Sequence, residues 1–179
     1  MSREEILRDI ASFEEHYQIM LKKLDTYSIY TRWTFSFVCN SVVIWSVCVR
    51  RYFRWRRLIK DVRKLYKICG IPLDYPMCDL PHRVKCLHAE VGKALFKLSG
   101  QFINEVTHLR DQEIQITQEF KKSNRRWTVF IMEKTSNPIF DLLDTIEDVY
   151  AALGVLYGPQ KEEIAALDRE IDNLLTRTA

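Results

Sequence analysis

Apolar side chains recur every three or four residues over the first 27 positions, which predicts an amphipathic helix. Ser2 and Glu5 have the spacing of a capping box, in which each side chain satisfies a backbone N–H at the start of the helix. A single helix cannot bury such a stripe alone, so we expect another helix of this chain or of a partner against it. The stripe consists of Ile6, Ile10, Phe13, Tyr17, Met20, Leu24 and Tyr27.

The next predicted helical segment, 29–68, has two halves of different character. No charged residue occurs between Trp33 and Val49, whereas residues 50–67 alternate between apolar and basic positions. Gly70, Pro72 and Pro76 then break the pattern. We therefore divide the chain into an N-terminal unit, 1–68, a loop, 69–81, and a C-terminal helical bundle, 82–179.

The C-terminal part continues with helical periodicity. One long helix is predicted over 81–120, with a bend near Gly92 or Gly100, and polar residues 121–126 interrupt it. Asn137-Pro138 is typical of a helix start, and Pro159 of another. The last predicted helix carries a second apolar stripe, which would pack on the long helix or on a partner: Ile164, Leu167, Ile171 and Leu174.

Taken together, these segments predict an all-α fold. Glycine and proline total only ten residues, which argues against a turn-rich β-sandwich. We expect an elongated helical bundle or coiled coil of about five helices, with 81–120 as its spine.

The uncharged stretch, 33–49, is a candidate membrane segment. Its 17 residues would span roughly 25 Å as a helix, slightly short of a hydrocarbon core of about 30 Å. Aromatic residues at one end and arginines at the other are typical of a transmembrane helix. The alternative, a core helix of a soluble bundle, is favoured by Ser36, Asn40, Ser41 and Ser46. The two interpretations stay open here.

Charge is unevenly distributed along the chain. Residues 50–67 contain nine basic and one acidic residue, and 136–179 contain three basic and nine acidic. Arginines interleaved with aromatic rings are suited to anionic lipid headgroups, whereas no nucleic-acid-binding motif is present. Alternatively, this basic face is simply solvated or neutralised by the acidic end. The expected lipid contacts are Trp33, Phe35, Phe37, Val43, Ile44, Trp45, Arg50, Arg51, Arg54, Trp55, Arg56 and Arg57.

Four Cys and His residues near the central loop form a candidate zinc site. Zinc prefers thiolate and imidazole ligands, and a loop beside a helix start is a common setting. The spacing Cys-x8-Cys-x3-His-x3-Cys is not specific, and buried thiols are the simpler interpretation. The candidates are Cys69, Cys78, His82 and Cys86. The odd number of cysteines, five, and the charged start of the chain indicate reduced thiols in an intracellular compartment.

The sequence contains no phosphate-binding glycine loop, nucleophile elbow or His-Glu-x-x-His motif. We therefore expect a non-catalytic adaptor or subunit, attached to a membrane through 33–57 and joined to partner proteins through its helical stripes. The alternative is a soluble, cytoplasmic interaction module with 33–49 as its buried core. A third hypothesis is a zinc protein or enzyme that uses the Cys/His cluster. No cofactor other than zinc is expected, and homo- and hetero-oligomers both remain open.

Overall fold

The computed structural model describes residues 2–37, 41–74, 77–122 and 126–178, with only the backbone for 28–37, 41–45, 161–162, 168, 172 and 174–178. Within these ranges the chain is helical and contains no strand. This confirms the all-α prediction, with six helices rather than about five. The helices are α1 (Arg3–Phe37), α2 (Ser41–Ile68), α3 (Leu80–Lys85), α4 (Ala89–Lys122), α5 (Arg126–Tyr157) and α6 (Lys161–Thr178).

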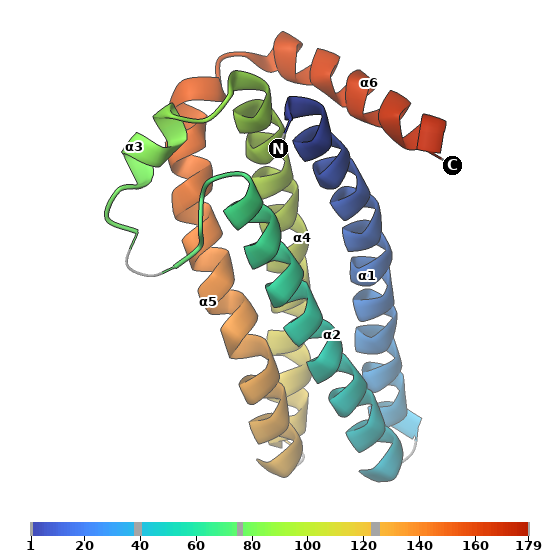
Figure 1. The fold of residues 1–179 in the computed structure, drawn as a ribbon. Helices are drawn as coiled ribbons and strands as arrows, with labels where there is room; N and C mark the ends of the chain where they lie inside the picture. Colours follow the sequence, from blue (N-terminus) through green and yellow to red (C-terminus); the bar gives the residue numbers. More distant parts are fainter. Residues whose placement is uncertain (1, 38–40, 75–76, 123–125, 179) are drawn as a thin grey trace.

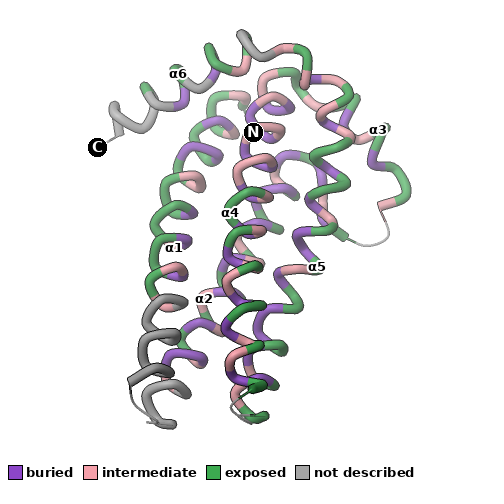
Figure 2. Tube along the Cα trace, turned by 180° about the vertical axis from the view of Figure 1, so that it is seen from behind, coloured by how far each residue is buried: buried purple, intermediate pink, exposed green. Residues whose placement is uncertain are grey.

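Four long helices, α1, α2, α4 and α5, run alongside one another as an elongated bundle (Figure 1). Successive long helices alternate in direction, so that α1 meets α2 and α4 meets α5 at the same end, here called the turn end. The short α6 lies across the opposite end and packs on α1 and α4. Figure 2 shows the buried positions on the inward sides of the long helices.

Local sequence signals explain several helix ends. The Ser2 backbone N–H donates to Glu5 Oε2 at 2.7 Å and the Glu5 N–H to Ser2 Oγ at 3.2 Å, so the predicted capping box is formed. At the end of α2, Gly70 has a φ of 89°, and the Ile71 N–H donates to the Tyr66 carbonyl at 2.9 Å. This is a Schellman ending, which favours glycine at the left-handed position. Both ends follow directly from the sequence.

The larger of two hydrophobic clusters among the described residues extends over both units expected from the sequence. Side chains from α1, α2, α4, α5 and α6 contribute to it, including Tyr17, Trp55, Leu95, Leu143 and Leu167. Burial of such surface stabilises a fold by about 25 cal/mol per Å². The loop that follows α2 therefore connects helices that share a core.

Both apolar stripes contribute residues to the chain's own core. Of the predicted contact residues, Ile10, Tyr17, Leu24, Leu167 and Ile171 are buried in the chain's own core. The N-terminal stripe is rotated slightly, because Leu7 and Leu21 are buried as well. The half-buried members of the two stripes are Ile6, Phe13, Met20, Tyr27 and Ile164, whereas the side chain of Leu174 lies outside the described residues.

Two predicted helix boundaries in the C-terminal part of the chain are wrong. The expected helix from 81 is divided into α3 and α4, with Cys86, Leu87 and His88 between them. Conversely, Pro138 does not begin a helix but lies inside α5. Val129 and Met132 before Pro138 and Ile139 and Leu142 after it are all buried. This continuous packing offsets the loss of one backbone hydrogen bond, which costs about 3 kcal/mol in an exposed helix.

Candidate functional site

The uncharged stretch is divided between two antiparallel helices. Residues 33–37 end α1 and residues 41–49 begin α2, so the stretch does not form the single helix that the sequence predicted. No helix in the described ranges carries an apolar segment of the length needed to cross a bilayer. The expectation of a transmembrane helix therefore finds no support.

The arginines of α2 differ in solvent exposure according to their position around the helix. Arg51 and Trp55 point into the bundle and are only 3% and 1% exposed, which corrects their assignment as lipid contacts. Arg50, Arg56 and Arg57 are exposed and Arg54 is half-buried. The expected contacts Trp33, Phe35, Phe37, Val43, Ile44 and Trp45 have side chains outside the described residues.

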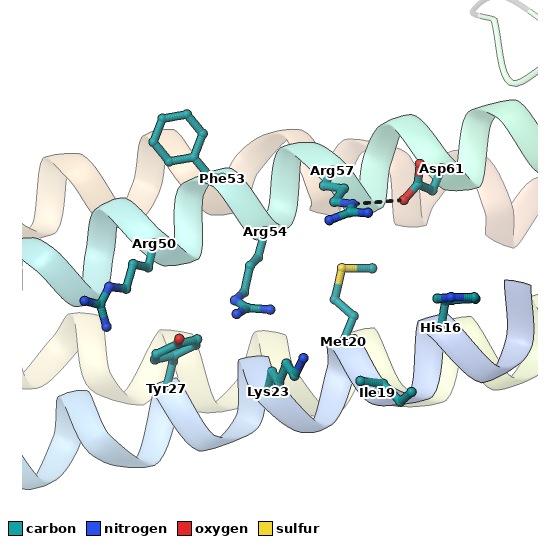
Figure 3. A pocket seen from close by; sticks show the side chains of 10 residues that line it. All are labelled: His16, Ile19, Met20, Lys23, Tyr27, Arg50, Phe53, Arg54, Arg57 and Asp61. Carbon is teal, nitrogen blue, oxygen red and sulfur yellow. Dashed lines mark ion pairs between the residues drawn. The ribbon is translucent and has the colours of Figure 1, made fainter.

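Arg50, Arg54 and Arg57 line a groove of about 620 Å³ between α1 and α2. Residues 50, 54 and 57 share one face of α2, because each is three or four positions from the next. Figure 3 shows Arg50 and Arg54 extending toward Lys23 and Tyr27 of α1. Each of the two helices contributes five residues to the lining, with the same sequence spacing in both. The lining residues are His16, Ile19, Met20, Lys23, Tyr27, Arg50, Phe53, Arg54, Arg57 and Asp61.

The groove is positively charged, because four basic side chains line it together with one carboxylate, that of Asp61. Arg57 Nε lies 3.9 Å from Asp61 Oδ2, and the Arg54 guanidinium lies 5.3 Å from the centre of the Tyr27 ring. Within the described part of the chain, neither Lys23 nor Arg50 has an ion-pair partner. Guanidinium groups present several N–H donors that match phosphate and carboxylate oxygens. The groove is therefore suited to bind an anion.

Little in the groove is suited to acid–base or nucleophilic chemistry. Its carboxylate, Asp61, is paired with Arg57, and the Nδ1 atom of His16 lies 2.6 Å from the Ser12 carbonyl of its own helix. The neighbouring apolar residues Ile19 and Phe53 are exposed. Binding, rather than catalysis, is what this arrangement of side chains supports.

The candidate zinc ligands do not converge in the described residues. Cys69 is buried in the core, and burial raises the pKa of its thiol to about 12. Cys78 is exposed, while Cys86 Sγ lies 3.6 Å from His82 Nε2 on the next turn. Across the described ranges, no three His, Cys, Asp or Glu side chains are placed to share a metal ion.

The sequence predicted part of this groove. It identified the basic face of α2 but not the contributions of Lys23 and Tyr27, which lie on a helix whose charge is nearly balanced. Helical spacing was the available signal, because it places residues 50, 54 and 57 on one face of α2 and residues 51 and 55 on its buried face.

Comparisons with protein-family models, curated proteins and solved structures found no match to this chain.

Proposed function

We propose that this protein is a non-catalytic helical bundle that attaches to the surface of a membrane containing anionic lipid through the groove between α1 and α2. The observation that carries the proposal is the convergence of Lys23, Arg50, Arg54 and Arg57 on one groove with a single carboxylate. The role is that of an adaptor or subunit, in which the bundle holds a fixed orientation on the membrane.

The magnitude of the electrostatic attraction supports this proposal. A basic residue near an anionic leaflet contributes about 1 kcal/mol, and the attraction decays within a Debye length of about 8 Å. Four cations opposed by Asp61 therefore supply roughly 3 kcal/mol, or about a hundredfold in partition. That strength fits reversible attachment that depends on salt, without a helix that spans the bilayer.

Partner binding is the second part of the proposed role. The buried residues of the apolar stripes are used within the chain, which leaves half-buried positions such as Phe13 and Met20 on α1 for another helix. Met20 lines the basic groove, and Phe13 lies two helical turns away on the same side of α1. A partner helix here would have to carry acidic residues.

One observation favours the alternative, an interaction module without membrane attachment. Val47 and Cys48, at the described end of the uncharged stretch, are buried in the bundle. If the rest of that stretch packs in the same way, the groove would bind an acidic protein segment instead of lipid headgroups. The experiment below separates these functions.

The test compares two triple variants that each remove three positive charges from α2. The groove variant is Arg50→Gln, Arg54→Gln and Arg57→Gln. The control variant is Lys60→Gln, Arg63→Gln and Lys67→Gln, whose positions are exposed on the same helix but do not line the groove. Binding to phosphatidylcholine–phosphatidylserine vesicles and to pure phosphatidylcholine vesicles is measured by flotation at low and high salt.

We expect the full chain to bind the vesicles with phosphatidylserine at low salt and to lose most of this binding in high salt. The groove variant should bind at least about tenfold more weakly, because it loses most of the local charge. The control variant should stay close to the unchanged chain. Equal losses in both variants, or no binding by the unchanged chain, would show that the groove is not a membrane site.

A further inference from the structure

We propose that the turn end of the bundle inserts shallowly between the headgroups and acyl chains of the bilayer, with Trp127 and Phe130 as the inserting side chains. This inference rests on the proposed membrane role and adds an apolar contact and an orientation to it. In this arrangement the bundle stands on the membrane on its turn end, with α6 at the distal end.

The first observation is two large aromatic rings in water. Trp127 is 79% exposed and Phe130 is 52% exposed, and both lie in the first turns of α5. They are three residues apart, and their ring centres lie 6.2 Å apart in an edge-to-face arrangement. Aromatic side chains can each bury 150–250 Å². In this bundle most of the surface of these two rings is exposed and can be buried by a binding partner.

The second observation is the charge that surrounds these rings. Lys121 and Lys122 end α4 and Arg126 begins α5, and all three residues are exposed. Lys121 Nζ lies 3.2 Å from Glu133 Oε1, so Lys122 and Arg126 carry the net positive charge of this group. Lys134 Nζ lies 5.7 Å from the centre of the Phe130 ring. Aromatic rings among basic residues are characteristic of helices that bind the interface of an anionic bilayer.

The third observation is that two segments far apart in the sequence meet at this end. The uncharged sequence 33–49 is divided between the end of α1 and the start of α2, and both lie at the same end as the turn between α4 and α5. A bilayer is a plane that both helix pairs can reach at once. A single partner helix in a groove would contact only part of this surface.

The geometry also connects this end with the basic groove. Arg50 lies nine residues from Ser41, the start of α2, which corresponds to roughly 14 Å along the helix. An end that penetrates by about 5–10 Å places Arg50 close to the headgroups. Arg57 lies about 10 Å farther away. Insertion and the attraction through Arg50 can therefore occur together, whereas Arg57 stays more than a Debye length of about 8 Å from the headgroups.

The test measures binding of the full chain to phosphatidylcholine–phosphatidylserine vesicles in low and in high salt. The variant W127A/F130A removes both exposed rings and leaves every charge in place. We expect its partition to fall by about tenfold or more, and the fraction that stays bound in high salt to disappear. Vesicles with brominated acyl chains should quench more fluorescence in the unchanged chain than in Trp127→Phe.

Two controls separate insertion from a general loss of apolar surface. The variant W127F/F130L keeps apolar side chains at both positions and should bind nearly as the unchanged chain does. Val155→Ala removes apolar surface at a residue that is 80% exposed near the opposite end of α5, and it should change nothing. Circular dichroism should give the same helix content for all three variants.

The results also distinguish this inference from the proposed function. Unchanged salt-resistant binding by W127A/F130A would overturn insertion, even if the groove variant loses its binding. A groove variant that binds normally while W127A/F130A does not would instead remove the groove from the membrane role. Self-association of the unchanged chain that W127A/F130A abolishes, without vesicle binding, would show that the rings form a protein interface and would overturn insertion.

Discussion

The guanidinium of Arg51 on α2 and the carboxylate of Glu113 on α4 form an ion pair inside the bundle, where each residue is 3% exposed. The Ser136 hydroxyl of α5 donates a hydrogen bond to the other carboxylate oxygen. Three of the four long helices are thereby joined by one polar network, close to the buried residues Cys48 and Met132. Removal of either charged side chain would leave the remaining charge buried without its ion-pair partner.

We predict that Arg51→Met or Glu113→Leu alone lowers the free energy of unfolding by about 3–5 kcal/mol, because each leaves an unpaired buried charge. The double variant R51M/E113L should recover most of this loss, since apolar groups of similar size can replace a buried ion pair. Urea denaturation of the three variants measures the coupling. Single variants that each cost less than about 1 kcal/mol would contradict a buried, paired arrangement.

The cysteines should differ sharply in reactivity. Burial raises the pKa of the Cys48 thiol, and the nearby positive charge of Arg51 only partly counteracts this increase. Burial also raises the pKa of the Cys69 thiol, to about 12. Because the thiolate is the reactive form, both residues should resist an aromatic disulfide reagent until the chain unfolds. The exposed Cys78 and Cys86 should react quickly. Peptide mapping by mass spectrometry identifies the order, and equal rates for Cys69 and Cys78 would contradict it.

Stability should decrease at alkaline pH. The pKa of Cys69 is about 12 in the folded chain and near 9 in an unfolded one, so the unfolded state loses this proton first. Stability is therefore unaffected below about pH 9 and falls as the pH rises toward 12, by about 1 kcal/mol at pH 10 from Cys69 alone. Burial also raises the pKa values of Tyr17 and Tyr66, which act in the same direction.

Urea denaturation at neutral pH and at about pH 10 measures this decrease. In Cys69→Ala the loss of stability over the same interval should be smaller, because the group that the folded state holds protonated has been removed. The same slope in Cys69→Ala and in the unchanged chain would show that Cys69 does not contribute.

The contact between α4 and the end of α5 depends on a glycine. A Cβ atom at Gly92 would overlap the ring of Tyr157, which is buried. We predict that Gly92→Ala destabilises the chain by about 1–3 kcal/mol through overpacking. Tyr157→Leu should relieve much of this cost in the double variant, as measured by thermal unfolding.

Gly154→Ala is the matched control for Gly92→Ala. Its Cβ would lie 3.4 Å from Phe96 Cε2, a far looser contact than the one at Gly92. Because alanine favours a helix by up to about 1 kcal/mol over glycine, Gly154→Ala should be neutral or stabilising. A stable Gly92→Ala variant would contradict the close packing of Tyr157 on α4.

Local features of the fold were predictable because their causes lie within a few residues. The capping box of Ser2 and Glu5 and the glycine ending at Gly70 need only neighbouring backbone groups. Pro138 shows the limit of such signals, because packing on both sides of it continues the helix that the local pattern would interrupt. The division of the uncharged stretch 33–49 between α1 and α2 was missed because apolar composition does not reveal where one helix ends and an antiparallel one begins.

By itself, the sequence determined that the chain is helical, where α2, α4 and α5 end, and that α2 carries a dense group of arginines. Only the tertiary structure decided that Arg51 lies inside the bundle with Glu113, while Arg50 and Arg54 face Lys23 and Tyr27 across a groove. The physical reason is that adjacent positions on a helix differ by about 100° in direction. Which direction faces the core depends on helices far away in the sequence.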